Sequence, residues 1–213
     1  GCNWTALPGI EYCAQDVTRV CLISPFLHAW DDVLADQARE PTLDALWERY
    51  VYHLGYIVDI IKQGFDIKME RHADNMPEIV LNLFCHGPIE RGVDAAAGGV
   101  DIYNLTMDGL GLATVADSFA AVEQRVVKEQ RLTWQELDRH LKNDFAGAED
   151  VRLMLNSIPR YGAGGTRGDW WAKRVAELWT HLVRDTPTPK GFRVIPGLFS
   201  HGGIAQYGRN LGA

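Results

Sequence analysis

The sequence lacks any apolar run long enough to cross a membrane, and this absence sets the first limit on the kind of protein it encodes. The longest apolar stretches, at residues 20–27 and 57–61, fall far short of the roughly 20 residues that a spanning helix needs. A signal peptide is not recognisable either. Basic residues are in the minority, because 21 Lys and Arg stand against 28 Asp and Glu, a net charge of −7. This balance argues against nucleic acid or an anionic membrane as the main partner.

Cysteine is also scarce, and its spacing argues against a cysteine-ligated metal protein and against a disulfide-rich secreted protein. The four cysteines are Cys2, Cys13, Cys21 and Cys85. They form no C-x-x-C pair, and no histidine lies at metal-ligand spacing from them, so we predict no bound metal and no bound cofactor in this chain. A disulfide framework suits a shorter secreted chain. We therefore expect a reduced, cytoplasmic protein.

What the sequence does contain is enough apolar material for a sizeable core. Of 213 residues, 46% are hydrophobic and 10% are aromatic, a composition typical of a folded chain. There is no internal repeat and no low-complexity linker, so we predict one domain, or a slice of a larger one, over residues 1–213. The chain starts with Gly and Cys instead of Met. We expect that it begins at a processing site, at the boundary of an expressed piece or at the edge of an incomplete gene.

The spacing of apolar residues predicts long helices in the first half of the chain. Residues 15–36 have helix-like spacing, although Pro25 should kink or interrupt that helix. Pro41 and Thr42 open a long helix whose pattern runs to about Arg71. A shorter helix should follow Pro77. Gly98 and Gly99 then predict a turn into a short alternating strand at residues 100–103.

The second half is predicted to be helical up to a final strand. Residues 112–131 read as a helix, and Thr133 with Glu136 predicts a capping box for a helix that runs to about Phe145. Two more helices are expected at residues 149–158 and 169–184, and a buried strand at residues 192–199. Long helices between a few short strands indicate an α/β fold.

Several candidate sites have simpler structural explanations. The glycine-rich loop at residues 162–166 follows no strand and lacks the Gly-Lys-Ser/Thr of a phosphate loop, so we interpret it as a connection between helices. His53 lies on the apolar face of its helix and is interpreted as a packing residue. His140 and His181 are expected at the surface, and the acidic residues 31, 32 and 36 are expected to form a solvated face.

Two segments remain as candidate sites. Residues 1–4 place Cys2 at the start of a loop that also contains Pro8 and Gly9, and residues 196–203 run from an apolar strand into a polar, glycine-rich turn. Taken alone, Cys2 would be interpreted as an inert structural thiol. The rest of the chain reverses that interpretation.

The reason is a series of motifs, in one order along the chain, that resembles the glycyl radical enzyme family of the pyruvate formate-lyase type. The family patterns are ERGKD-x-x-x-GG-x-x-YN, GxGLANVADSLAA, ITxEEL…NFEG, APKYGND and PGLYS. Their counterparts here are ERGVD at 90–94 with GG at 98–99 and YN at 103–104, GLGLATVADS at 109–118, LTWQEL at 132–137 with NDFAG at 143–147, PRYG at 159–162, and PGLFS at 196–200. Residues 207–213 also resemble the family's next segment. The resemblance covers essentially the whole chain.

This resemblance implies a fold, a chemistry and partners. The fold would be part of a ten-stranded barrel, its second half-barrel, surrounded by long helices, with the glycine-radical domain missing from these residues. Cys2 would be the catalytic cysteine, whose thiyl abstracts a substrate hydrogen so that a C–C or C–heteroatom bond is cleaved or formed in anaerobic metabolism. The glycyl radical would lie on the missing segment and be installed by an S-adenosylmethionine iron–sulfur activase. The other partners would be a small-molecule substrate and, in the intact enzyme, a second copy; the 213 residues alone would be inactive.

The departures from the family patterns leave the substrate open. Eliminating members usually read Gly-Cys-Val-Glu, in which the glutamate shuttles a proton, whereas Trp4 stands at that position here. Pyruvate formate-lyase itself has two adjacent cysteines, and Gly1 precedes Cys2 here. Trp4 is a candidate pocket wall or simple loop packing, and Ser200 with His201 are candidate substrate-binding groups, although His201 would also suit a surface turn. The alternative function is a catalytically inactive relative kept as a binding or scaffold protein.

Overall fold

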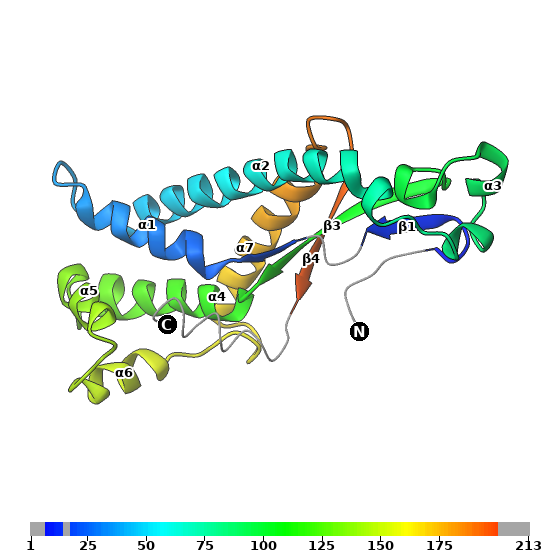
Figure 1. Cartoon of the computed structure of the whole chain (residues 1–213). Helices are drawn as coiled ribbons and strands as arrows, with labels where there is room; N and C mark the ends of the chain where they lie inside the picture. Colours follow the sequence, from blue (N-terminus) through cyan, green and yellow to red (C-terminus); the bar gives the residue numbers. More distant parts are fainter. Residues whose placement is uncertain (1–6, 15–17, 200–213) are drawn as a thin grey trace. The chain divides into compact units, whose positions relative to one another are not determined.

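The computed structural model describes residues 7–14 and 18–199 (Figure 1). The strands are β1 (Glu11–Ala14), β2 (Arg19–Cys21), β3 (Ile102–Leu110) and β4 (Val194–Phe199). The helices are α1 (Ile23–Ala35), α2 (Leu43–Asn75), α3 (Pro88–Arg91), α4 (Leu112–Ala121), α5 (Trp134–Lys142), α6 (Glu149–Asn156) and α7 (Arg167–Arg184). Two 3₁₀ turns, η1 (Leu81–Leu83) and η2 (Ala95–Ala97), and one π-helix, η3 (Val122–Lys128), complete the described elements.

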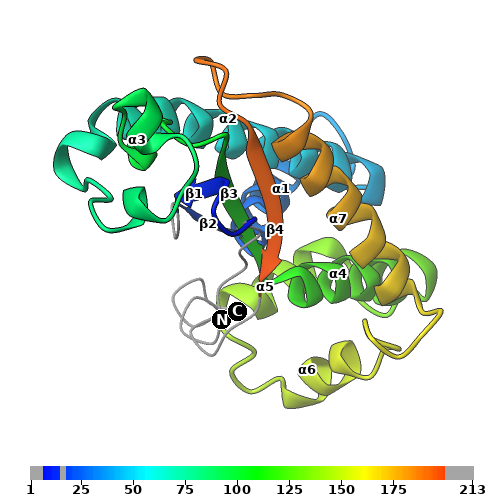
Figure 2. The same ribbon diagram turned by 90° about the vertical axis from the view of Figure 1, so that its right-hand side faces the viewer.

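Strand β3 is the centre of the sheet and pairs with β1, β2 and β4. Figure 2 shows β3 between β1 and β4. β1 and β3 run parallel, in a register that matches Glu11 with Ile102 and Ala14 with Leu105. From Asn104 to Leu110 every residue of β3 is buried. Burial on both faces is typical of a central strand in a sheet covered by helices, and the predicted α/β class is confirmed.

Two predicted elements are wrong in their extent. Residues 19–21 form strand β2 beside β3, so the helix expected from residue 15 begins only at Ile23. Pro25 then falls in the first turn of α1, where its missing N–H has no intrahelical partner to lose, and it does not interrupt the helix. The strand expected at 100–103 is the nine-residue β3, and it is buried throughout its second half instead of alternating.

Apart from the helix expected after Pro77, the other helix predictions are confirmed, with shifted ends. The Thr42 hydroxyl accepts the Ala45 N–H (3.1 Å) at the start of α2, which runs four residues past the predicted end. The capping box of α5 is formed, because Thr133 Oγ1 accepts the Glu136 N–H (3.2 Å) and the Glu136 carboxylate accepts the Thr133 N–H (2.8 Å). The helix predicted over 112–131 is α4 followed by η3. The helix predicted directly after Pro77 is wrong, because the chain there forms only the short 3₁₀ turn η1.

The chain divides into two compact units. The first contains the described parts of Gly1–Val20, Gly55–Gly109 and Trp179–Leu198, and the second contains Cys21–Leu54, Leu110–Leu178 and Phe199. The core of the first unit includes Tyr12, Val58, Phe65, Leu105, Met107 and Trp179. The core of the second includes Phe26, Leu46, Tyr50, Phe119, Trp171 and Val175.

Candidate functional site

The four residues that the sequence predicts for the site, Cys2, Trp4, Ser200 and His201, lie outside the described residues. The structure does describe the points at which the two predicted loops join the fold. The first loop is followed by Leu7 and strand β1, and the second is preceded by strand β4. Both strands pair with β3. The two predicted segments are therefore connected to neighbours of the same central strand.

The residues that follow the cysteine loop are fixed by one carboxylate. The carbonyl of Leu7 accepts the N–H groups of Ile10 (3.2 Å) and Glu11 (3.0 Å), which closes a tight turn in which Gly9 has a φ of +80°. Glu11 Oε2 in turn accepts the Leu7 N–H (3.0 Å), and Glu11 Oε1 accepts from the side-chain amide of Asn104. Asn104 is the asparagine of the YN motif, so that motif joins the start of β1 to β3.

Strand β4 is held by a backbone and an indole hydrogen bond. The Leu105 N–H of β3 donates to the Arg193 carbonyl (3.1 Å) just before β4 begins. Further along, the indole Nε1 of the buried Trp179 donates to the Gly197 carbonyl (2.9 Å). A buried indole N–H needs an acceptor, and here the acceptor is the backbone of the PGLFS motif. The tryptophan thus holds strand β4 at Gly197.

A cluster of phenols, not predicted from the sequence, lies beside β1. Tyr12 and Tyr103 are stacked with ring centroids 5.4 Å apart. The Tyr12 hydroxyl donates to Glu78 Oε1 (3.0 Å) and lies 3.1 Å from His72 Nε2. Burial raises the pKa of both phenols, so they remain protonated near neutral pH and act as hydrogen-bond donors. Only Tyr103, through its place in the YN motif, carried a sequence signal.

The ERGVD segment builds a tight loop. Burial alone would raise the pKa of Asp94, but hydrogen bonds from the Asn82 amide (2.7 Å) and from the N–H groups of Ala96 (2.7 Å) and Glu78 (3.0 Å) outweigh it and lower that pKa. Arg91 Nη1 donates to the Gly99 carbonyl (2.6 Å). These charged motif residues are used for structure, because their partners are backbone and side-chain groups of the same loop.

In the second unit, the motif residue Asp117 joins α4 to the PRYG loop. Its carboxylate accepts from Arg160 Nε (2.9 Å) and from the Tyr161 N–H (2.8 Å). Asp169 then accepts the N–H groups of Gly162 (2.7 Å) and Thr166 (2.9 Å), and backbone hydrogen bonds lower the pKa of its carboxylate. The glycine-rich loop is therefore a connection between helices, as predicted, and Asp169 closes it.

A second buried carboxylate, Glu123, anchors α7. It lies in the π-helix η3 and accepts from Trp171 Nε1 (2.8 Å), Arg167 Nε (3.0 Å) and Lys128 Nζ (2.7 Å). Burial by itself would raise the pKa of Glu123, but these partners outweigh it and lower the pKa. No sequence pattern indicates this group, because residue 123 falls inside a stretch with the spacing of a continuous α-helix.

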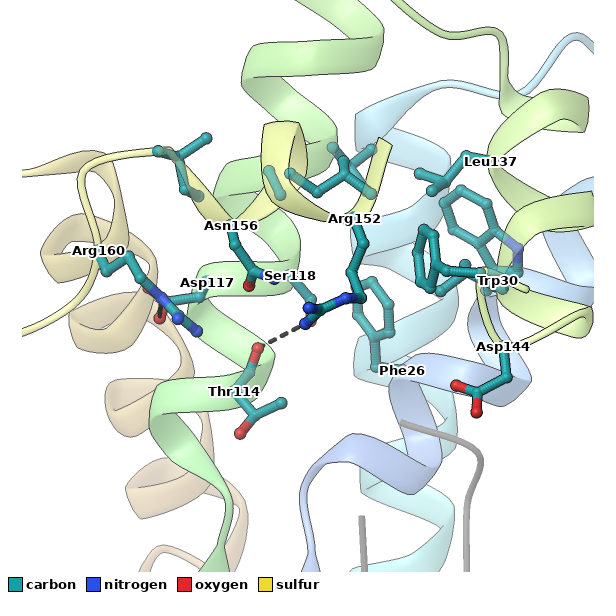
Figure 3. A pocket seen from close by; sticks show the side chains of 16 residues that line it. Phe26, Trp30, Thr114, Asp117, Ser118, Leu137, Asp144, Arg152, Asn156 and Arg160 are labelled. Atoms are coloured by element: carbon teal, nitrogen blue, oxygen red, sulfur yellow. Dashed lines mark hydrogen bonds and ion pairs between the residues drawn. The ribbon is translucent and has the colours of Figure 1, made fainter. Parts of the chain in front are cut away.

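A cavity of about 420 Å³ lies in the second unit among α1, α4, α5 and α6. Figure 3 shows Phe26 and Trp30 on one side of it and Asp117 with Arg160 on the other. The family-like segments 109–118, 143–147 and 159–162 all contribute to its lining. Its volume is within the range of small-molecule sites. Three of its four charged lining side chains are already paired, Asp117 with Arg160 and Arg152 with Glu149, so the cavity offers space and apolar contact more than reactive groups.

Two histidine predictions are also tested by the described residues. His53 Nε2 lies 2.9 Å from Asp32 Oδ2 and is half-buried, which confirms a packing residue with a satisfied ring. His181 is exposed and pairs with Asp185. Within residues 7–14 and 18–199, no three His, Cys, Asp or Glu side chains gather as a metal site would require. Over the same residues no helix is long and apolar enough to span a membrane.

Comparison with known proteins gives consistent matches. The family model described as pyruvate formate lyase-like matches residues 34–208. An isethionate sulfite-lyase of Oleidesulfovibrio alaskensis is 41% identical over 144 residues, which cover 66% of this chain and 17% of that protein. A (2S)-3-sulfopropanediol dehydratase of Klebsiella oxytoca is 26% identical over 160 residues, 74% of this chain and 19% of that protein.

Solved structures show the same fold. The glycerol-bound B12-independent glycerol dehydratase of Clostridium butyricum superimposes with a TM-score of 0.80 at 22% identity, over 94% of this chain and 27% of that one. A glycyl radical enzyme of Archaeoglobus fulgidus gives a TM-score of 0.76 at 20% identity, over 89% and 25%. The chain therefore spans less than a third of the length of each relative, and its fold is that of a part of a glycyl radical enzyme barrel.

Proposed function

Because the chain belongs to the pyruvate formate lyase-like family, we propose that it is the cysteine-bearing part of a glycyl radical lyase that acts on a small molecule. The match of the family model to residues 34–208 carries this proposal. Cys2 itself lies outside the matched range, and its role is supported by the Gly1-Cys2 resemblance and by the anchoring of the following strand β1 on β3. The glycyl radical would lie on a segment outside these 213 residues.

In this proposal Cys2 is a hydrogen-atom relay. Cys2 gives its S–H hydrogen to the radical-bearing glycine, so that an S–H bond breaks and a C–H bond forms. The sulfur-centred radical then takes a hydrogen atom from one carbon of the substrate, which regenerates the S–H bond and leaves the unpaired electron on that carbon. No charge moves in either transfer, so the thiol needs no lowered pKa. It needs a closed, dry cavity and an oriented C–H bond.

The residues around Cys2 bear on the substrate class. The relatives are named for small hydroxylated molecules, among them isethionate, sulfopropanediol and trans-4-hydroxy-L-proline. A carboxylate beside the cysteine would accept a proton from such a substrate, whereas the indole of Trp4 can only donate a hydrogen bond and fill space. We therefore propose Trp4 as a pocket wall, and Ser200 with His201 as the polar groups that bind the substrate.

Two macromolecular partners belong to the same proposal. The radical has to be installed by a separate S-adenosylmethionine iron–sulfur activase, and the intact enzyme is proposed to be a homodimer. Both follow from family membership and concern the whole enzyme, of which these residues are a part.

The test is a Cys2→Ser substitution in the full-length product of the gene, activated under anaerobic conditions. An O–H bond is too strong for a glycyl radical to break readily, so we expect the radical signal in electron paramagnetic resonance and no turnover. Isethionate, (2S)-3-sulfopropanediol, trans-4-hydroxy-L-proline and glycerol form the substrate panel. Substantial turnover by Cys2→Ser would move the chemistry to another residue. A wild-type protein that forms no radical would support the binding or scaffold alternative.

A further inference from the structure

Glu11 makes more hydrogen bonds than the pairing of its strand requires. Strand β1 is already joined to β3 by the parallel ladder, in which the Ile102 N–H donates to the Ile10 carbonyl (3.0 Å). The Glu11 side chain adds a second link, because its Oε1 accepts from the side-chain amide of the buried Asn104 on β3. Burying an amide and a carboxylate costs free energy that an apolar pair of similar size would not cost. Strand pairing alone therefore does not account for this pair.

The other carboxylate oxygen shows what the pair does beyond strand pairing. Glu11 Oε2 accepts the Leu7 N–H (3.0 Å). Leu7 is the first described residue after the predicted cysteine loop, so its N–H is the described backbone donor nearest in sequence to Cys2. Five residues of extended chain span at most about 17 Å, so a shift of Leu7 displaces the whole range of positions open to Cys2. An apolar side chain at position 11 could not hold this N–H.

The turn between Leu7 and Glu11 has a second anchor. The His86 N–H donates to the Gly9 carbonyl (2.6 Å). Asn104, which holds Glu11, belongs to the part of β3 in which every residue is buried. A chain of hydrogen bonds thus runs from the central strand through Glu11 to Leu7, and the residue that leaves the cysteine loop is tied to the best-supported strand of the sheet.

We propose that Glu11, held by Asn104, is a positioning residue for the hydrogen-atom transfer between Cys2 and the radical-bearing glycine. The proposal rests on the relay function proposed above for Cys2. Transfer of a hydrogen atom depends steeply on the distance between its donor and acceptor atoms, and a misplacement of about 1 Å lowers a rate by about 100-fold. In this role Glu11 acts through the backbone of Leu7 and not on the reacting atoms.

This transfer can be followed without any substrate. A glycyl radical carries one hydrogen on its α-carbon, and that hydrogen splits the electron paramagnetic resonance signal into a doublet. In D₂O the Cys2 thiol carries deuterium. When the thiol gives deuterium to the glycine, an S–D bond breaks and a C–D bond forms. When the thiyl takes the original hydrogen back, a C–H bond breaks and an S–H bond forms. The glycyl radical then carries deuterium, and the doublet collapses at a rate that reports the transfer.

The experiment uses the full-length gene product, activated under anaerobic conditions and transferred to D₂O. Glu11→Ala removes the acceptor of the Leu7 N–H, and Asn104→Leu removes the link to β3 while keeping the side-chain volume. We expect the collapse of the doublet to slow at least about tenfold in both variants. Glu11→Gln should stay within about twofold of wild type, because its amide oxygen accepts the Leu7 N–H and its NH₂ donates to a flipped Asn104 amide.

Asp66→Ala is the matched control. The buried Asp66 also accepts one side-chain donor, Thr188 Oγ1, and one backbone donor, the Lys190 N–H (2.9 Å). It holds the connection between α7 and β4 instead of the residue after the cysteine loop. Asp66→Ala should lower Tm at least as much as Glu11→Ala does, because Asp66 is the more buried carboxylate, and it should leave the rate of collapse unchanged.

The outcomes separate positioning from stability and from the function of Cys2. The rate is measured on the radical that forms, so a lower yield of folded protein does not change it. Collapse at the wild-type rate in Glu11→Ala or in Asn104→Leu would overturn the proposal, and so would equal slowing in Asp66→Ala. Those results would leave the relay function of Cys2 intact. A wild-type radical that keeps its doublet in D₂O would instead contradict the relay itself, and this proposal with it.

Discussion

Replacing Glu123 by alanine should destabilise the second unit more than any exposed ion pair could. The Glu123 carboxylate is buried in η3 and accepts three hydrogen bonds, from Trp171, Arg167 and Lys128. Its three partners differ in exposure, since the side chains of Arg167 and Lys128 are about half exposed while Trp171 is buried. Most of the lost stability should therefore come from the Trp171 indole, which would have no acceptor for its N–H.

The magnitude follows from that difference. Arg167 and Lys128 can return to water, which makes their loss small, as for surface pairs. The Trp171 N–H is left buried without an acceptor, which costs about 1–3 kcal/mol, and the lost packing of the side-chain stem adds about 1 kcal/mol. We expect Glu123→Ala to lower the free energy of unfolding by about 3 kcal/mol. For a chain of this size that corresponds to a Tm lower by roughly 6–12 °C.

Urea unfolding, followed by tryptophan fluorescence and by circular dichroism, measures this change. Glu123→Gln keeps an acceptor for the indole and should lose about 1–2 kcal/mol less than the alanine variant. The matched control is Glu149→Ala, which removes an exposed pair with Arg152 and should change stability by no more than about 0.5 kcal/mol. If Glu123→Ala and Glu149→Ala were equally stable, the carboxylate would not anchor α7 and the reasoning would be refuted.

Three further predictions concern acid, glycine and tryptophan. The pKa of Glu123 is lowered in the fold, so its contribution to the free energy of unfolding is present above the ordinary glutamate pKa and is lost as pH falls below about 4.5. Wild type should therefore lose stability between pH 5 and 3 more steeply than Glu123→Gln. Equal slopes in urea titrations across this pH range would contradict the prediction. Gly99→Ala should lower the free energy of unfolding by at least about 3 kcal/mol, because the new Cβ would overlap the Val93 carbonyl. Gly98→Ala has open space at a φ of +90° and should lower it by about 1 kcal/mol. Similar denaturation midpoints for the two variants would contradict this difference. In the full-length enzyme, Trp4→Glu should weaken substrate binding by about 2–4 kcal/mol without creating a dehydratase, and diol dehydration at the native rate would overturn the pocket-wall assignment.

The sequence predicted correctly those helices whose ends are determined by residues a few positions apart. The long helix α2 begins where Thr42 caps it, and α5 begins at the Thr133–Glu136 capping box. Both signals involve residues three positions apart, which a sequence displays directly. The family-like motifs predicted the family, and the family model that matches residues 34–208 confirms it.

The extent of the strands was missed, because strands are stabilised by partners that lie far away in the sequence. Residues 19–21 carry helix-like spacing, yet they form β2 because a distant strand offers them a partner. The length of β3 was missed for the same reason, since the polar Asn104, Thr106 and Asp108 interrupt its apolar pattern although all three are buried. The spacing of apolar residues predicts which face of a single element is buried. It does not predict that a strand about 90 residues later in the chain will pair with that element. The predicted site residues at both ends of the chain stay predictions.

The central position of β3 also sets the order in which the chain can fold during synthesis. β1 has its parallel partner about 90 residues downstream, and β4 reaches β3 only after about 90 residues more. At roughly 5–20 residues per second, β1 waits about 5–20 s for its partner after it has been made. Loop closure over such separations makes pairing slow, so the strand that follows Cys2 is exposed to chaperones, or to wrong partners, for seconds in each molecule. Changing the rate of translation between residues 14 and 110 should therefore change the yield of correctly folded protein.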